Sequence, residues 1–272
     1  PYSLWKKDTE TTITNSQSPV SKTLLIPLAA RAGEAKREQP VVRDKKAADI
    51  LSQIDVSDIT IDGGEMATLG ILARTMVIDD EIGKLLVETP DLIILNLGAG
   101  LDTRISRIDN GLLHSYDLDL LEVIEWRRKF FAENERIHFI AGSVLKSDWM
   151  QALGTLDGGK TVIIAEGLLM YFPEREVRQI FAMLADRFPG AQMFCDVVHS
   201  YFVGKGISSS FQWGIDQAND VERLDPRLRL VQAWSTGNLL KKRQSPFFRM
   251  MNVLPGTRNR SQILHLRFES EV

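Results

Sequence analysis

A strand that runs directly into a glycine-rich turn, at residues 91–104, restricts the fold of this chain more than any other stretch. Leu92 to Leu97 is apolar with no helical or alternating period, which predicts a parallel strand covered on both faces. Gly98 and Gly100 follow at once, and glycine permits a sharp turn and leaves room for a ligand. Open α/β sheets bind nucleotides at this point, beyond the carboxyl end of the first strand. The alternative is a turn whose small residues serve only packing, and the glycines alone do not decide between the two.

After this turn, short apolar runs alternate with helical segments. Strands are predicted at 112–119, 137–141, 162–165 and 192–198, and helices at 121–134 and 174–188. This alternation is typical of right-handed βαβ crossovers and therefore of a parallel sheet. Residues 263–269 alternate like a final strand, with too little chain left for another crossover helix. The chain therefore belongs to the α/β class.

The first ninety residues are predicted to be mostly helical, with helices at 21–37, 44–54 and 66–86. Pro27 is expected to interrupt the first of them. We predict a helical cap or lid over residues 1–90 and an α/β domain over 91–272, with an insertion at about 200–260, as one compact unit. Whether the cap covers the sheet or closes as a lid stays open.

Composition restricts the partners and the compartment. The net charge is −3 and no long basic block occurs, which argues against a nucleic-acid partner. No apolar stretch approaches the ~20 residues of a transmembrane helix, so no membrane span is expected. The single cysteine, Cys195, excludes an internal disulfide and favours a cytoplasmic protein; its apolar surroundings predict an inert core thiol. No His, Cys, Asp or Glu cluster has metal-ligand spacing, so no metal is predicted.

Asp119 is the first residue that favours a ligand at the glycine turn. It lies 19 residues after Gly100, at the end of the next predicted strand. An acid at about this spacing accepts hydrogen bonds from ribose hydroxyls in nucleotide-binding folds. The alternative is a helix N-cap, because a helix is predicted to start near Leu121. Together with the glycine turn, we favour ribose.

The residues after the glycines indicate which nucleotide is bound. A dinucleotide fingerprint requires Gly or Ala where this chain has Thr103. Asp102 would also repel a diphosphate. A ligand with ribose and adenine but no phosphate fits better, and S-adenosylmethionine is such a ligand.

Three motifs extend this argument: residues 96–104 (NLGAGLDTR), 116–119 (YDLD) and 165–171 (AEGLLMY). Weaker matches in the N-terminal part are Ser21-Lys22-Thr23, Arg31, Asp44 and the segment from Arg74 to Asp79. This pattern resembles the leucine carboxyl methyltransferase family of class I S-adenosylmethionine-dependent enzymes, closest to its bacterial polyketide-type O-methyltransferases. The resemblance covers about residues 20–200. It implies a Rossmann-like, seven-stranded sheet with a reversed last strand.

The resemblance also implies roles for single residues. Arg74, with Lys22, would hold the methionyl carboxylate of the cofactor; without the resemblance Arg74 reads as a solvated helix residue. Glu166 would face the amino acid end, or else be a solvent-facing loop acid. Ser143 stands where many relatives have Asp, which weakens the expected adenine contact. The full set of predicted cofactor-binding residues is Lys22, Arg74, Gly98, Ala99, Gly100, Asp119, Leu120, Ser143, Val144, Glu166 and Gly167.

The methyl acceptor is less defined. A carboxylate is ionised at neutral pH and needs no base, whereas a phenol would need one, for which His199 and Tyr201 are candidates. Tyr171 matches a family tyrosine that would orient the acceptor oxygen. Four aromatic residues either line a substrate pocket or form the core of an insertion: Trp213, Trp234, Phe247 and Phe248.

The predicted function is methyl transfer to a carboxylate or hydroxyl of a small molecule, with a polyketide-type metabolite as one option. The alternatives are a nicotinamide-dependent oxidoreductase and a non-catalytic relative that binds the cofactor or a partner. The sequence does not indicate an oligomeric state.

Overall fold

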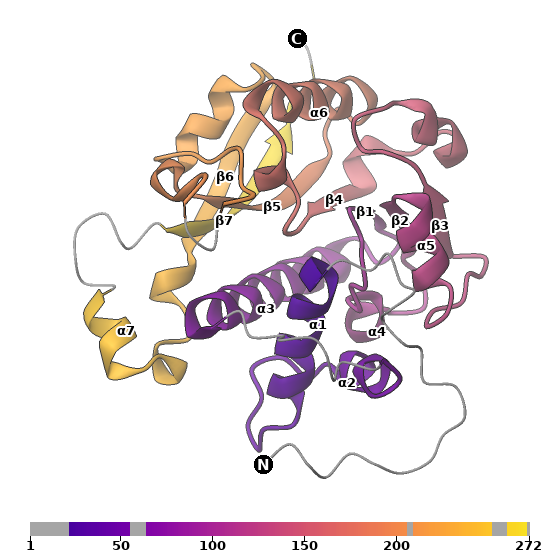
Figure 1. Ribbon diagram of the computed structural model, residues 1–272. Coiled ribbons are helices and arrows are strands. Elements are labelled where there is room, and N and C mark those ends of the chain that lie inside the picture. Colours follow the sequence, from indigo (N-terminus) through magenta and orange to yellow (C-terminus); the bar gives the residue numbers. More distant parts are fainter. Residues whose placement is uncertain (1–21, 55–63, 206–208, 252–259, 271–272) are drawn as a thin grey trace.

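A seven-stranded sheet forms the centre of the molecule (Figure 1). The computed structural model describes residues 22–54, 64–205, 209–251 and 260–270. The strands are β1 Ile93–Leu97, β2 His114–Asp119, β3 Ile137–Ala141, β4 Thr161–Ala165, β5 Gln192–Val198, β6 Leu228–Ser235 and β7 Ser261–Phe268. Their order is β3-β2-β1-β4-β5-β7-β6. The first five are parallel, and β7 runs antiparallel to both of its neighbours. The predicted α/β fold with a reversed last strand is therefore confirmed.

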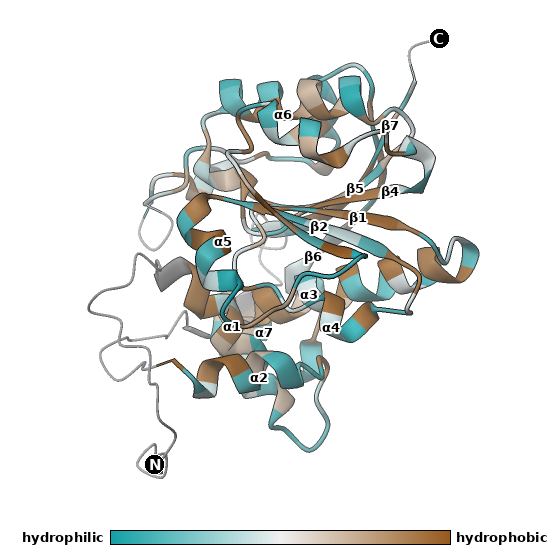
Figure 2. Ribbon diagram, turned by 90° about the vertical axis from the view of Figure 1, so that its right-hand side faces the viewer, coloured by the Kyte–Doolittle hydropathy of each residue, from teal (hydrophilic) through white to brown (hydrophobic). Residues whose placement is uncertain are grey.

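Helices cover both faces of this sheet (Figure 2). They are α1 Lys22–Ala35, α2 Lys45–Ser52, α3 Gly64–Glu88, α4 Ile105–Ile108, α5 Leu121–Arg127, α6 Glu174–Arg187 and α7 Pro246–Met251. Successive strand residues point to opposite faces, so Ile94 packs against α3 while Leu95 packs on the side of α6. The long helix α3, from the N-terminal part of the chain, is thus one of the layers that cover the sheet.

The first two helices pack against each other and against α5. Their shared cluster includes Leu28 of α1, Ile50 of α2 and Trp126 of α5. The prediction that Pro27 interrupts the first helix was wrong, because α1 continues through it. The proline lies near the start of the helix, where the missing N–H removes only one early hydrogen bond. Burial of Leu28 beside it then holds the helix together.

Two other elements differ from the sequence-based expectation. Helix α5 ends at Arg127, well before Asn134, because Asn134 folds back to accept hydrogen bonds from the first residues of the turn into β3. Strand β6 lies in the 200–260 segment, for which no strand was predicted. It is one of the two edge strands, several of its side chains are exposed, and its register shifts between Leu230 and Gln232. A shifted edge strand loses the clean alternation by which strands are recognised.

No helix in the described ranges is both long and apolar enough to cross a membrane.

Candidate functional site

The carboxyl ends of the parallel strands border a cavity of about 420 Å³. The glycine turn after β1 forms one part of its wall, and the segment after β4 with Glu166 and Gly167 forms another. Arg74 reaches it from α3 and Asp196 from β5. Residues that are far apart in the sequence therefore meet here, because β1, β4 and β5 end at the same edge of the sheet and α3 contributes Arg74 from its interior.

The glycine turn needs its glycines for the backbone itself. Gly98 has a φ of +65° and Gly100 a φ of +50°, in the region that L-residues with side chains rarely adopt. A Cβ at Gly98 would lie 2.7 Å from Leu168 Cδ1, and one at Gly100 2.8 Å from Leu24 Cδ2. Both glycines and Ala99 line the cavity. The close packing of Leu168 and Leu24 therefore requires glycine at both positions. Because these glycines have no side chains, their backbone atoms face the cavity.

Asp119 ties the end of β2 to this turn. Its Oδ2 accepts a hydrogen bond from the Gly100 amide at 2.8 Å, and its Oδ1 accepts one from the Leu120 amide at 2.7 Å. The alternative reading as a helix cap was wrong, since Leu120 is the N-cap of α5. Burial raises the pKa of Asp119, against the opposing effect of these two amides.

The other residues predicted for the nucleoside end lie next to Asp119, outside the cavity wall. Leu120 is about half exposed. Ser143 and Val144 form the turn after β3, where Ser143 Oγ accepts a hydrogen bond from the Leu145 amide at 3.3 Å and Val144 is buried. The structure thus brings the ends of β2 and β3 together. The side chain of Lys22 lies outside the described part of the chain.

Arg74 is held by two carboxylates. Its Nε donates to Glu166 Oε1 at 2.8 Å and its Nη1 to Asp196 Oδ2 at 2.9 Å. Asp196 Oδ1 also accepts the Gly167 amide, so it joins the arginine to the turn after β4. The readings of Arg74 as a solvated helix residue and of Glu166 as a solvent-facing acid were both wrong, because their side chains are only 15% and 9% exposed. Among the described residues, Arg74 Nη2 has no hydrogen-bond partner, which leaves donors for a ligand in the cavity.

These pairs are the end of a longer row of ion pairs, which we call the ion-pair chain. It alternates arginine and carboxylate from the N-terminal helices to β5, with N–O distances between 2.5 and 2.9 Å. Its members in order are Arg31, Asp44, Arg107, Asp79, Arg104, Glu166, Arg74 and Asp196. The orientation of Arg74 therefore depends on residues in four helices and two strand ends.

Arg104 occupies the middle of the ion-pair chain and is almost fully buried. It bonds Asp79, Asp102 and Glu166. Burial alone would raise the pKa of Glu166, but the charges of Arg104 and Arg74 outweigh it and hold the pKa below its usual value. The pKa of Asp102 is likewise held well below its usual range, since nearby guanidinium groups, Arg104 first, outweigh the effect of burial. Asp102 and Glu166 can thus be ionised in a buried setting.

Sequence reasoning missed Asp196 and the partners of Arg104. Asp196 carries one signal in the sequence, as a lone acid inside the otherwise apolar strand β5. A buried acid in such a strand requires a cation. Its partner Arg74 lies 122 residues away, so no local spacing marks the pair.

The cavity also has apolar and aromatic lining residues, which we call the apolar wall. Tyr171 belongs to it, with its ring packed edge-on against Phe211 at 5.2 Å between ring centroids. Burial raises the pKa of Tyr171, so its hydroxyl is protonated at neutral pH. Met66, Met170 and Phe202 complete this wall.

The aromatic residues predicted for a substrate pocket separate into three groups. Phe248 lines the cavity, whereas Trp213 is buried in the core and Trp234 packs beside another core cluster. Phe247 is 67% exposed. Of the four, Trp213 and Trp234 therefore serve packing, and only Phe248 lines the cavity.

Two side chains after β5 were candidates for a base. His199 Nδ1 accepts a hydrogen bond from the Tyr201 amide at 3.1 Å and caps the turn after β5. Tyr201 is 64% exposed, and its ring meets that of Phe202 edge-on. His199 is thus used for local structure. Cys195, predicted as an inert core thiol, is fully buried, and burial raises its pKa.

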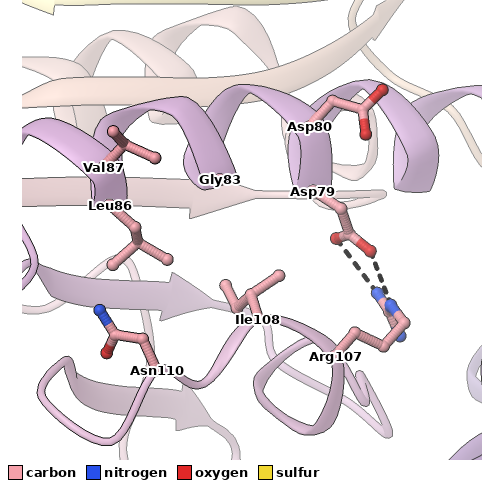
Figure 3. A pocket seen from close by; sticks show the side chains of 8 residues that line it. All are labelled: Asp79, Asp80, Gly83, Leu86, Val87, Arg107, Ile108 and Asn110. Carbon is pink, nitrogen blue, oxygen red and sulfur yellow. Dashed lines mark hydrogen bonds and ion pairs between the residues drawn. The ribbon is translucent and has the colours of Figure 1, made fainter.

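A second hollow, of about 490 Å³, lies between α3 and α4 (Figure 3). Asp79 and Arg107 face each other there as part of the ion-pair chain. Its other walls include Leu86 and Ile108. The hollow thus marks the outer side of the ion-pair chain, away from the glycine turn. In the described ranges, no group of three or more His, Cys, Asp or Glu side chains is arranged to hold a metal ion.

Comparison with known families and proteins gives consistent results. The profile of the leucine carboxyl methyltransferase family matches residues 25–185. The tetracenomycin polyketide synthesis O-methyltransferase TcmP of Streptomyces glaucescens is 29% identical over 226 residues, which is 79% of this chain and 83% of that protein. The S-adenosyl-L-methionine-dependent methyltransferase dpfgK of Gibberella zeae is 24% identical over 237 residues, covering 76% of this chain and 79% of that one.

Solved structures share the fold at low identity. A DUF574 family protein from Streptomyces avermitilis superposes with a TM-score of 0.56 at 11% identity, covering 89% of this chain and 97% of that one. The N-methyltransferase NodS from Bradyrhizobium japonicum, in complex with S-adenosyl-l-homocysteine, gives a TM-score of 0.50 at 10% identity, covering 90% and 99%. At such identities these two structures support the fold alone.

Proposed function

The chain belongs to the leucine carboxyl methyltransferase family of S-adenosylmethionine-dependent methyltransferases, and from this premise we propose that it methylates a carboxylate or hydroxyl oxygen of a small molecule. One observation carries the proposal. A single cavity is lined both by the glycine turn with Arg74 and by the apolar wall with Tyr171. A volume of about 420 Å³ suits small molecules, within the range typical of ligand sites.

The residues at the sheet edge fit S-adenosylmethionine. Arg74 has donors left over after it bonds Glu166 and Asp196, and a guanidinium fork matches a carboxylate such as the methionyl group. Asp119 is a half-buried acceptor at the end of β2, at the position suited to ribose hydroxyls. The glycine turn between them brings backbone close to the cavity. We therefore assign cofactor binding to the residues predicted from the sequence, with Asp196 added as the residue that orients Arg74.

The cofactor supplies an electrophilic methyl group on its sulfonium when bound. The protein has to bind, align and shield the acceptor. An acceptor carboxylate, with a reference pKa near ~4, is already ionised and needs no base. The protonated hydroxyl of Tyr171 donates a hydrogen bond that positions the acceptor oxygen. The apolar wall around Tyr171 excludes water from this end of the cavity.

The similarity to TcmP supports an acceptor of the polyketide type. Such acceptors are flat, apolar and oxygen-rich, in agreement with the aromatic and methionine side chains of the wall. The lone, buried Cys195 supports a cytoplasmic setting.

Binding and turnover measurements test the proposal. The thermal midpoint should rise with S-adenosylmethionine or S-adenosylhomocysteine and stay constant with NAD. Incubation with methyl-deuterated cofactor and a panel of aromatic carboxylic acids and phenols should yield labelled methyl esters or ethers by mass spectrometry. A variant Arg74→Met should lose most of the cofactor-induced rise in midpoint. Cofactor binding without methyl transfer to any compound would instead support a non-catalytic relative, and a rise only with NAD would refute the proposal.

A further inference from the structure

Arg260, directly before β7, is an arginine of the cavity lining that forms no ion pair with a carboxylate of the described residues. It lines the cavity, and its Nε is buried without a hydrogen-bond partner among the described residues. Its guanidinium lies 5.5 Å from the ring centroid of Phe202, and its Nη1 lies 3.6 Å from Met66 Sδ. No carboxylate in the described ranges forms an ion pair with it. A thioether and an aromatic face are weak partners for a positive charge compared with a carboxylate.

The other arginines of the cavity differ in this respect. Arg31 is paired with Asp44, and Arg74 is paired with Glu166 and Asp196. Buried polar groups in folded proteins are normally satisfied, and an exception in a cavity indicates a missing partner. Because Arg260 contacts the ligand space with an unpaired donor, its partner is expected to come from a ligand.

The position of Arg260 separates it from the proposed cofactor carboxylate site. Met66, which it contacts, precedes Arg74 by eight residues in α3. At a rise of about 1.5 Å per residue, these two residues lie about 12 Å apart along the helix axis. Arg260 thus lies near the N-terminal end of α3, whereas Arg74 enters the cavity from the middle of this helix.

We propose that Arg260 binds an anionic group of the methyl acceptor, so that the acceptor is an apolar, aromatic acid anchored at the end of the cavity remote from Arg74. This inference rests on the proposed function, because it concerns the acceptor of that reaction. The methionine and aromatic walls take the apolar body, and the guanidinium fork takes a carboxylate or an equivalent anion. The anchored anion differs from the oxygen that receives the methyl group, which has to lie at the cofactor side. Arg260 is therefore a specificity-determining residue.

Binding of two matched probes tests the anchor. The probes are 6-hydroxy-2-naphthoic acid and 6-hydroxy-2-naphthamide, which share ring and hydroxyl and differ in charge. Isothermal titration to the full chain saturated with S-adenosylhomocysteine should show the acid binding at least about tenfold more tightly than the amide, as a charge-assisted bidentate contact implies. Arg260→Met should abolish this preference and leave the amide affinity within about twofold, because the apolar wall is retained. Arg260→Lys should keep part of the preference.

A matched control is Arg229→Met on the edge strand β6, where the arginine is half exposed and paired with Glu269. It should leave the preference for the acid intact. Equal affinity of both probes for the unmodified protein, a preference that survives in Arg260→Met, or no binding of either probe would each overturn the assignment. Affinity for S-adenosylhomocysteine distinguishes a failure of the Arg260 assignment from a failure of the proposed function. If it is normal in the unmodified protein and in Arg260→Met, the failure concerns the anchor alone; if the unmodified protein does not bind it, the proposed function fails.

Discussion

Replacement of Arg104 by methionine would test whether the ion-pair chain holds the site together. The side chain is 2% exposed and bonds three carboxylates, at 2.7 Å to Asp79, 2.8 Å to Asp102 and 2.5 Å to Glu166. After the replacement, Asp79 keeps Arg107 and Glu166 keeps Arg74. Asp102 loses its only ion-pair partner among the described residues. Methionine has a similar length, so the main change is the loss of the charge and its donors.

The expected cost follows from burial. Removal of one partner from a buried ion pair destabilises a protein by about 3–5 kcal/mol, because an uncompensated charge stays in a medium of low polarity. A domain with a typical unfolding free energy of about 5–15 kcal/mol would still fold. The variant should therefore remain measurable by urea denaturation followed by circular dichroism.

The loss of unfolding free energy in Arg104→Met should depend on pH, and the directions of the pKa shifts determine whether it grows or shrinks toward acid pH. In the unmodified protein the pKa values of Asp102 and Glu166 lie below those of the unfolded chain. Their contribution to stability is thus present above the unfolded values, near ~4, and is lost only at lower pH. In the variant one of the counteracting charges is missing, so the folded-state pKa values of Asp102 and Glu166 rise. The folded variant then binds protons at a higher pH than the folded unmodified protein does, and the difference in stability between the two should shrink as the pH falls from 7 toward about 4.5.

An exposed pair provides the control. Arg128 and Glu133 are 46% and 39% exposed, so Arg128→Met should cost less than about 1 kcal/mol at either pH. If Arg104→Met cost no more than this control at pH 7, or if its cost grew toward acid pH, the account of the ion-pair chain would be refuted.

Three further variants address the glycine turn and the two ends of the cavity. Gly98→Ala should lower the unfolding free energy by about 1–2 kcal/mol, because its φ of +65° and the contact with Leu168 leave no room for a methyl group; urea titration measures this. Asp119→Ala should weaken binding of S-adenosylhomocysteine by at least about 1 kcal/mol, since ribose hydroxyls and the Gly100 amide lose their acceptor; an unchanged affinity by calorimetry would contradict the ribose assignment. Tyr171→Phe should reduce kcat/KM about 3- to 10-fold at unchanged cofactor affinity, and equal loss of both would instead indicate a structural role.

The buried parallel strands were predictable because both of their faces are covered. Strand β5 has the predicted bounds, and its apolar run follows directly from burial. The edge strand β3 also has the predicted bounds. The other edge strand, β6, was not predictable, since exposure and the register shift between Leu230 and Gln232 remove its pattern. The prediction failed where most side chains are exposed, because burial there no longer determines the residue type.

The same distinction holds within the site. The glycine turn, Asp119 and Glu166 stand in contiguous motifs, so their positions were predictable from local spacing. The partners of Arg74 were not, because Asp196 reaches it only through the arrangement of β5 beside β4. A pair of this kind becomes apparent when the sheet order is known.

The cavity is lined partly by ion-paired residues and partly by apolar residues. This difference explains why the sequence predicted the cofactor but not the acceptor. The cofactor side consists of charges that satisfy one another along the ion-pair chain, so a change at one position leaves a buried charge elsewhere. Such a network restricts its members strongly and leaves recognisable motifs. The acceptor side consists of apolar side chains such as Met66 and Phe202, which tolerate exchange, and of Arg260, which has no partner within the described chain. An unpaired residue can be replaced without disturbing the fold, so acceptor specificity can change at this end while the cofactor site stays constant. With Arg260 in the proposed role, acceptor specificity depends on an isolated residue that carries no motif.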